Sequence, residues 1–207
     1  MRVRPPVRYG TMGVMDASQV TALRELLSTT GWPERTQDFA HALRTSARVP
    51  GSLLLFGPPD DEPWHLAAHL DDESRLNALP EISPTLVRWS PPPGAPAHLR
   101  IGLDRLEAAR RGESLLVVAE DAAPEGLLQR VDDARRVGAT IFAMDGDDDE
   151  LRGLAHESLT IPSSDSLVSF DAAQHLVSAA AGEPRSRRGL RDRLADLLDT
   201  ITGPPAG

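Results

Sequence analysis

Two histidines stand four residues apart in the segment 64–70, which has the pattern of a helix. Positions i and i+4 share one helix face, so the imidazoles of His65 and His69 are expected to lie side by side. Two histidines at this spacing can share a zinc ion if a third ligand comes from elsewhere in the chain. A His-Glu-x-x-His protease motif is excluded, because Leu66 stands where that motif has its general base. A pair of surface or half-buried histidines without a metal is the alternative.

Acidic residues follow an apolar run at 114–119 and could take part in proton transfer. A carboxylate or an imidazole can act as a general base that accepts a proton from a substrate. Glu120 and Glu125 are candidates for that base, as is His175 much later in the chain. We therefore predict Glu120, Glu125 and His175 as catalytic residues, and Asp121 as a residue that contacts the substrate.

These residues are positioned by short apolar runs that alternate with helical spacers. Each run is nearly continuous, as in parallel strands covered by helices on both faces, whereas antiparallel strands with one wet face would alternate. Pro124 fits the first turn of one spacer, and Gly138 fits the position just past its end. The apolar runs stand at 52–56, 85–89, 114–119, 139–144 and 158–162, and the helical patterns at 16–29, 33–46, 62–70, 99–111, 124–137, 150–155 and 170–181. The sequence therefore predicts an α/β fold with a doubly wound parallel sheet and helices at both ends of the chain.

Two turns fall where a doubly wound sheet binds its ligands, beyond the carboxyl ends of the strands. One follows the run 52–56 and contains Gly57, Pro58 and Pro59, and the other spans 120–124. A phosphate cradle needs Gly, Ser or Thr residues whose amides can approach the anion. Prolines have no amide hydrogen and carboxylates repel an anion, so neither turn has the composition of a phosphate cradle.

Over residues 115–162 the chain resembles the second half of a sugar isomerase (SIS) domain. The matching segments are LLVVAEDAAPE at 115–125, ARRVGATIFAM at 134–144 and LRGLAHESLTIP at 151–162, and a looser match covers 51–182. The family has an apolar strand, a phosphate loop, a helix ending in Gly-Ala, a strand, and a short strand ending in proline. The resemblance implies a SIS-like, flavodoxin-type three-layer sandwich. The chain departs from the family at the phosphate loop, where a Ser-x-Ser-Gly-x-Thr type of turn is replaced by acids and Pro124.

The resemblance also implies a site. The sedoheptulose 7-phosphate isomerase branch is nearest in helix pattern; its His-x-x-x-Glu metal ligands correspond to His65 and His69. On the helix 170–181, Gln174 matches a family glutamine, while His175 follows it by one residue instead of three. The resemblance also implies that the protein forms a homodimer through this helix and that its ligand is a small anionic sugar. The predicted substrate-binding residues are Gly57, Asp121, Ser163, Ser164 and Gln174.

The composition narrows the class of protein. All 22 basic residues are arginine against 31 acidic residues, for a net charge of −9, which argues against a nucleic-acid partner. The abundance of Arg, Ala, Pro and Asp is typical of a GC-rich, actinobacterial type of genome. There is no cysteine, so disulfides and thiolate metal sites are excluded. No apolar run is long enough for a membrane span and no secretory signal is recognisable, so a cytoplasmic protein is expected.

The chain divides into three parts on this reading. Residues 1–13 are expected to be a flexible arm, 14–182 the SIS-like domain, and 183–207 a linker and an amphipathic helix that could bind a protein partner. We predict a non-catalytic or weakly active module that binds a carbohydrate derivative such as a phosphosugar, or that serves regulation or assembly. A phosphosugar isomerase is the first alternative. A metal-dependent hydrolase using His65, His69 and the acids at 145–150 is the second, and whether the chain is an enzyme stays open.

Overall fold

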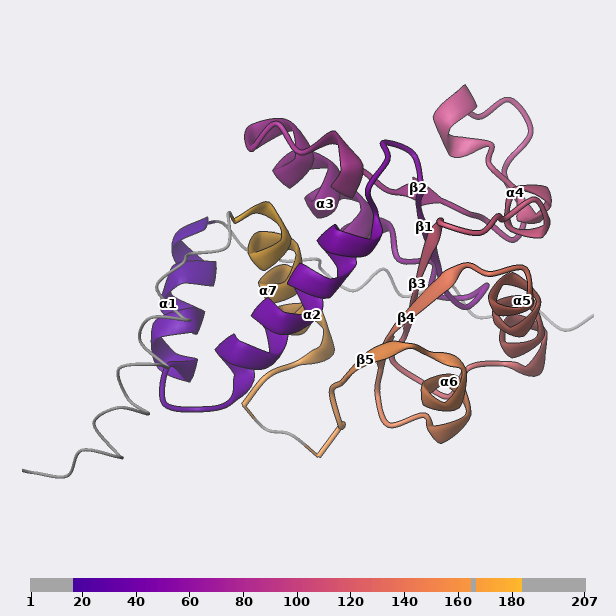
Figure 1. The fold of residues 1–207 in the computed structure, drawn as a ribbon. Coiled ribbons are helices and arrows are strands. Elements are labelled where there is room, and N and C mark those ends of the chain that lie inside the picture. The colour runs from indigo at the N-terminus through magenta and orange to yellow at the C-terminus, as the bar shows by residue number, and fades with distance from the viewer. Residues whose placement is uncertain (1–16, 165–166, 184–207) are drawn as a thin grey trace, which may run out of the picture.

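The computed structural model describes residues 17–164 and 167–183, which form an α/β fold with a five-stranded, all-parallel sheet (Figure 1). The strand order β2-β1-β3-β4-β5 is that of a doubly wound sheet of flavodoxin type and confirms the predicted fold class. The strands are β1 (Leu53–Phe56), β2 (Thr85–Leu86), β3 (Ser114–Ala119), β4 (Thr140–Asp145) and β5 (Glu157–Thr160). The helices are α1 (Ala17–Leu27), α2 (Trp32–Ser46), α3 (Trp64–Leu76), α4 (Leu103–Glu107), α5 (Glu125–Arg136), α6 (Asp149–Leu154) and α7 (Phe170–Gly182), with short 3-10 turns η1 (Pro80–Ile82) and η2 (Ala97–Leu99).

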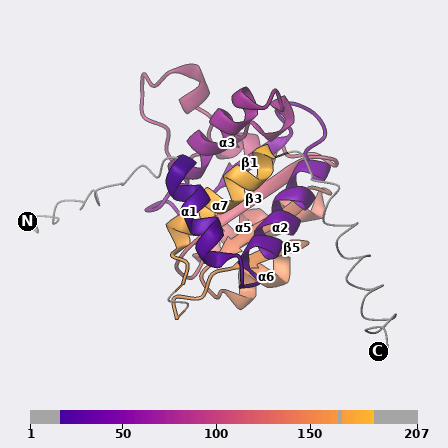
Figure 2. The ribbon, with the colours of Figure 1, turned by 90° about the vertical axis from the view of Figure 1, so that its left-hand side faces the viewer.

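Both faces of the sheet are covered, because successive side chains of a strand point to opposite faces and almost all of them are apolar. Leu53 and Leu55 of β1 pack with α1, α2, α3 and α7, whereas Leu54 and Phe56 pack with α4, α5 and α6. The four helices of the first group stand in front of the sheet in Figure 2. The two hydrophobic clusters make the three-layer sandwich that the sequence predicts.

Two expected elements are shorter than the sequence pattern indicates. The strand predicted at 85–89 ends at Leu86, because the amide of Arg88 donates to the carbonyl of Ile101. The helix predicted at 99–111 is limited to η2 and α4. Its last turn is replaced by a loop in which Gly112 has a positive φ of 89° and the amide of Arg110 donates to Glu113. The strand is shortened by a hydrogen bond to a residue distant in sequence, and the helix by a hydrogen bond to a residue just beyond its predicted end.

The helix predicted to form a homodimer is largely covered by its own chain. Ala173, Leu176 and Val177 of α7 are buried in the cluster that α2 and α3 share. A dimer through the rest of α7 stays a prediction. The expected N-terminal arm at 1–13 and the amphipathic helix near the C-terminus lie outside the described residues. None of the helices in the described part is both long and apolar enough to span a membrane.

Candidate metal centre

The candidate site lies at the carboxyl edge of the sheet. Helix α3 follows β1 and helix α7 follows β5, so both begin on the side where the parallel strands end. The turns after β1, β3 and β4 reach the same edge. Open parallel sheets bind their ligands in this region.

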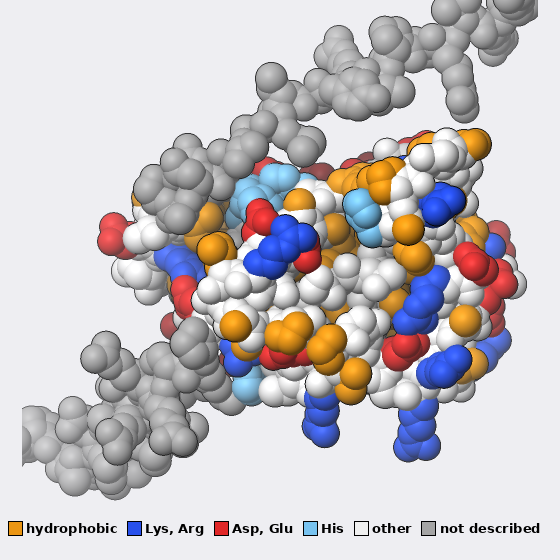
Figure 3. Space-filling model, turned by 90° about the horizontal axis from the view of Figure 1, so that it is seen from above, with side chains coloured by type: hydrophobic (Ala, Val, Ile, Leu, Met, Phe, Trp, Pro, Cys, Tyr) orange, Lys and Arg blue, Asp and Glu red, His pale blue; other side chains and the backbone are white. Residues whose placement is uncertain are grey.

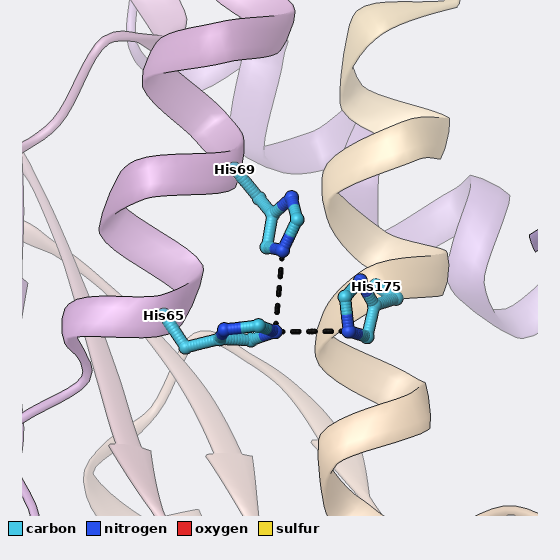
Figure 4. Close-up of side chains that lie close together, drawn as sticks. All are labelled: His65, His69 and His175. Atoms are coloured by element: carbon cyan, nitrogen blue, oxygen red, sulfur yellow. Dashed lines mark hydrogen bonds between the residues drawn. The ribbon is translucent and has the colours of Figure 1, made fainter. Parts of the chain in front are cut away.

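Three histidine side chains meet between α3 and α7. His65 and His69 project from successive turns of α3 toward His175 on α7 (Figure 4). The Nε2 atom of His65 lies 2.9 Å from Nε2 of His175 and 3.2 Å from Nε2 of His69. His175 is only 2% exposed, whereas His65 and His69 are partly exposed. Within the described part of the chain, these three form the one group of at least three His, Asp or Glu residues whose ligand atoms all lie within 4.8 Å of one another.

The three imidazoles cannot satisfy one another with hydrogen bonds alone. A neutral histidine carries one N–H and one nitrogen lone pair, so Nε2 of His65 either donates once or accepts along one direction. It nevertheless faces two other Nε2 atoms within hydrogen-bond distance. A cation between the rings would accept a lone pair from all three nitrogens. The arrangement therefore fits a metal ion better than it fits a hydrogen-bonded network.

The electrostatic surroundings keep two of the imidazoles in the form that binds metals. Burial lowers the pKa of His69 and of His175, and the neighbouring histidines lower both pKa values further. Asp171 acts in the opposite direction on both, as a smaller contribution. Its Oδ1 lies 3.6 Å from Nε2 of His65 and its Oδ2 lies 3.9 Å from Nε2 of His175. A metal-binding histidine must be neutral, so the environment favours binding near neutral pH.

The donor set and its spacing are typical of zinc. Zinc binds imidazole nitrogen at about 2.0–2.1 Å in tetrahedral geometry, which places the ligand nitrogens roughly 3.4 Å from one another. The separations of 2.9 and 3.2 Å need only a small outward movement to reach that value. Asp171 stands close enough to serve as a fourth ligand after a side-chain rotation, and it is exposed enough to rotate.

Carboxylates gather beside the histidines. Burial raises the pKa of Glu120, and Asp61, Asp121 and Asp171 raise it further by repulsion. Burial likewise raises the pKa of Asp61, with a contribution from Asp121. The turns after β1 and β3 and the start of α7 therefore place Asp61, Asp121 and Asp171 within electrostatic reach of Glu120. Histidine side chains reach one face of the molecule near acidic ones in the view of Figure 3.

The turn that carries Glu120 is held by the turn after β4. Gly146 lies against the backbone of Glu120, so that a methyl group at Gly146 would overlap the Glu120 carbonyl oxygen. The carboxylate of Asp148 accepts a hydrogen bond of 2.7 Å from the amide of Ala123. Two neighbouring turns thus form one rigid unit at the carboxyl edge.

Replacing Glu120 with glutamine should raise the melting temperature at pH 7. A carboxyl group with a raised pKa in the folded state makes its contribution to stability below its unfolded pKa and loses it as pH rises through the folded pKa. At pH 7 the ionised Glu120 is therefore a net cost, which Glu120→Gln removes. Thermal unfolding from pH 4 to pH 8 measures the effect. The gain should shrink toward pH 4, and an equal gain at all pH values, or a loss at pH 7, would contradict the assignment. Glu125→Gln, on the α5 surface, is the matched control.

The structure separates the predicted catalytic residues. His175 joins His65 and His69, and Glu120 lies within electrostatic reach of Asp171 on the same helix as His175. Glu125 instead lines a groove on the other face of the sheet. The residues of that groove belong to α5 and α6: Glu125, Leu128, Gln129, Asp132, Glu150 and Leu154. The three catalytic candidates therefore do not form one constellation.

The predicted substrate-binding residues are spread along the carboxyl edge. Gly57 is tightly enclosed, because a side chain there would contact Pro63 and the carbonyl of Val118. The carbonyl of Gly57 accepts a hydrogen bond from the indole of Trp89. Asp121 is exposed and adds to the charge beside Glu120. Gln174 is half-buried next to His175 in the sequence. Ser163 and Ser164 are exposed in the turn after β5. Their role in binding a substrate stays a prediction.

The acids at 145–150 are predicted from the sequence as possible metal ligands of a hydrolase, but several of them have structural roles in the fold. Asp145 is fully buried and accepts hydrogen bonds from Arg152 and Thr160. Asp148 is the N-cap of α6. Arg152 also pairs with Asp147 and Asp149. These acids do not belong to the histidine group.

The pairing of Asp171 with His175 could have been found from the sequence. The two residues have the same i, i+4 spacing as His65 and His69, at the start of α7. Asp61 and Asp171 are absent from the site predicted from the sequence, and Asp61 has no such spacing that would have indicated it.

No protein-family model matches the chain, and no curated protein matches it. Among solved structures, it is similar to a protein from Silicibacter pomeroyi DSS-3 described as a "putative phosphosugar isomerase", with 18% identity, a TM-score of 0.50, and coverage of 88% of this chain and 52% of that chain. It is also similar to a "putative sugar binding protein" from Salmonella typhimurium LT2, with 18% identity, a TM-score of 0.49, and coverage of 86% and 52%. The chain thus spans about half the length of each. At this identity the likeness concerns the fold alone.

Proposed function

We propose that this chain is a SIS-like protein that binds a divalent transition metal ion, best matched by zinc, through His65, His69 and His175. The convergence of three Nε2 atoms at the carboxyl edge of the sheet carries the proposal. The metal centre and the acids beside it serve a carbohydrate derivative that binds at the same edge. The SIS-like fold supports this ligand class, and the position of the site at the carboxyl edge is consistent with it.

The chain's own residues have distinct tasks in this proposal. The three histidines hold the ion, and Asp171 orients them or completes the coordination. Zinc, when bound, supplies a Lewis acid that polarises an oxygen of the ligand. The lowered pKa values of His69 and His175 match the requirement of zinc for deprotonated nitrogen ligands. Binding is the primary function we infer, in a module that is non-catalytic or weakly active.

Aldose–ketose isomerisation is the second candidate function. The specific observation that favours it is the raised pKa of Glu120, because a base works best when its pKa approaches the working pH. Glu120 would move the proton between adjacent carbons of a sugar held beside the histidines. Turnover of a panel of aldoses and sugar phosphates by the zinc-loaded chain, lost in Glu120→Gln, would support it. Inactivity across the panel would leave binding as the function.

Calorimetric titration of the chelator-treated full chain with zinc tests the primary proposal. We expect one zinc ion per chain and little proton release from His69 and His175, since their lowered pKa values favour the neutral form at pH 7. Absence of saturable binding would overturn it. The same titration with magnesium is a control, because magnesium prefers oxygen ligands in octahedral geometry and should not bind three imidazoles.

Zinc should also stabilise the fold. A ligand that binds only the folded state at a free concentration of 100 times its Kd adds about 2.7 kcal/mol to the free energy of unfolding. For a chain of this length that corresponds to a rise in melting temperature of roughly 5–10 °C. Scanning calorimetry with and without zinc measures the shift. An unchanged melting temperature at saturating zinc would contradict the site.

A further inference from the structure

Several backbone amides at the carboxyl edge are bonded to acceptors of the protein itself. In the turn after β1, Pro58 and Pro59 have no amide hydrogen, and the amide of Asp61 donates to the carbonyl of Pro58. At the start of α7, the hydroxyl of Ser169 accepts from the amide of Ala172. A phosphate group is normally held by free amides in such turns and helix starts.

Two carboxylates occupy the place of an anion in the turn after β4. Asp145 Oδ1 accepts from the amides of Asp147 and Asp148, each at 3.0 Å. Asp148 accepts from the amides of Glu150 and Leu151 at 2.9 and 3.0 Å. Its second oxygen accepts from the amide of Ala123 in the turn after β3. The amides that could cradle a phosphate here are already paired with a negative charge.

Acidic side chains of the neighbouring turns add to this charge. Burial raises the pKa of Glu120 and of Asp61, and repulsion adds to both shifts: Asp61, Asp121 and Asp171 act on Glu120, and Asp121 acts on Asp61. Two arginines of the described part, Arg88 after β2 and Arg152 in α6, are engaged elsewhere. Arg88 pairs with Glu62 and covers the ring of Trp64, and Arg152 pairs with buried Asp145. The acids would repel the phosphate group of a phosphorylated sugar, and apart from the metal ion neither of these two arginines is free to offset that repulsion.

We propose that the ligand of this edge is an unphosphorylated carbohydrate, and that the acids beside the histidines favour one that carries an amine. The inference rests on the proposed function, since it names the substrate class of the same site. The hydroxyl groups of a sugar can bind a metal ion and carboxylates without any anion cradle. An ammonium group in addition forms charge-assisted hydrogen bonds with carboxylates such as Glu120 and Asp61.

Three sugars that differ in one group test the proposal on the zinc-loaded full chain. They are D-glucose, D-glucosamine and D-glucose 6-phosphate, which are neutral, cationic and anionic, and their affinities are measured by NMR titration at fixed ionic strength. We expect glucosamine to bind at least tenfold more tightly than glucose 6-phosphate, with glucose between them. Tighter binding of glucose 6-phosphate, or no binding of any of the three, would overturn the inference.

A double variant attributes the selectivity to the acids. Asp61→Asn with Glu120→Gln should remove the preference for glucosamine over glucose and should leave zinc stoichiometry unchanged. Glu125→Gln with Asp132→Asn removes the same charge from the groove between α5 and α6 and should keep the preference. A preference that survives the first variant would contradict the assignment. Zinc stoichiometry is measured first on every sample. Loss of zinc binding then identifies a failure of the metal centre. Normal zinc binding with a different order of sugar affinities identifies a failure of this inference alone.

Discussion

Replacing His175 with alanine is expected to weaken zinc binding by about 100-fold or more. Substitution of residues that only orient a metal ligand costs about 10–100-fold in affinity, and the loss of a direct ligand should cost at least as much. His175 supplies the one nitrogen that comes from α7, while His65 and His69 both stand on α3. Two ligands one turn apart can still bind zinc weakly, so a residual affinity is expected. Calorimetric titration of each purified variant measures the change.

Two further variants distinguish loss of a metal ligand from loss of the fold. His175 is buried, so His175→Ala also leaves a cavity, and His65→Ala at a partly exposed position provides a second variant with the same expected loss. His98→Ala, at an exposed residue of η2 remote in sequence from the cluster, is the matched control and should bind zinc like the wild type. Wild-type zinc affinity in a folded His65→Ala or His175→Ala protein would show that the three rings are not ligands.

Gly146→Ala is expected to destabilise the fold by at least about 2 kcal/mol. The added methyl group would overlap the carbonyl oxygen of Glu120, and backbone atoms on both turns must move to admit it. For a chain of this length the melting temperature should fall by about 4–8 °C. Because the two turns form one unit, the position of Glu120 should change as well, and the preference for glucosamine should fall with it. Chemical denaturation and the sugar titration measure the two effects.

Gly153→Ala provides the contrast for this prediction. Gly153 lies in α6, and a methyl group there meets nothing within 4 Å. The change should be neutral or should stabilise the protein by up to about 1 kcal/mol, because alanine has the higher helix propensity. A Gly146→Ala protein as stable as Gly153→Ala would show that the turns after β3 and β4 are not in close contact.

Much of the fold follows from local patterns in the sequence. The apolar runs at 114–119 and 139–144 are continuous because helices cover both faces of their strands, and that pattern predicts a parallel sheet. The short strand β2 and the short helix α4 are less predictable. Their ends depend on hydrogen bonds with partners elsewhere, such as that between Arg88 and Ile101, which no local pattern records.

The site could be predicted only in part. The i, i+4 spacing of His65 and His69 fixes a shared helix face, and this half follows from the sequence. The third histidine depends on how α7 rotates when it packs on α2 and α3, because burial of Ala173, Leu176 and Val177 determines where His175 points. The proximity of Glu120 to Asp171 likewise arises from the packing of α7 on α2 and α3, which returns the chain from the edge strand β5 toward the middle of the sheet.

Zinc K-edge X-ray absorption spectroscopy of the zinc-loaded full chain tests the metal centre most directly. The three histidines should appear as three imidazole nitrogens at about 2.0–2.1 Å from the ion, with the outer-ring scattering that imidazole produces. An additional oxygen ligand in the first coordination shell of the ion would correspond to Asp171 or a water molecule. A spectrum of oxygen ligands without imidazole scattering, or a protein that retains no zinc after desalting, would contradict the assignment of His65, His69 and His175 as a metal centre.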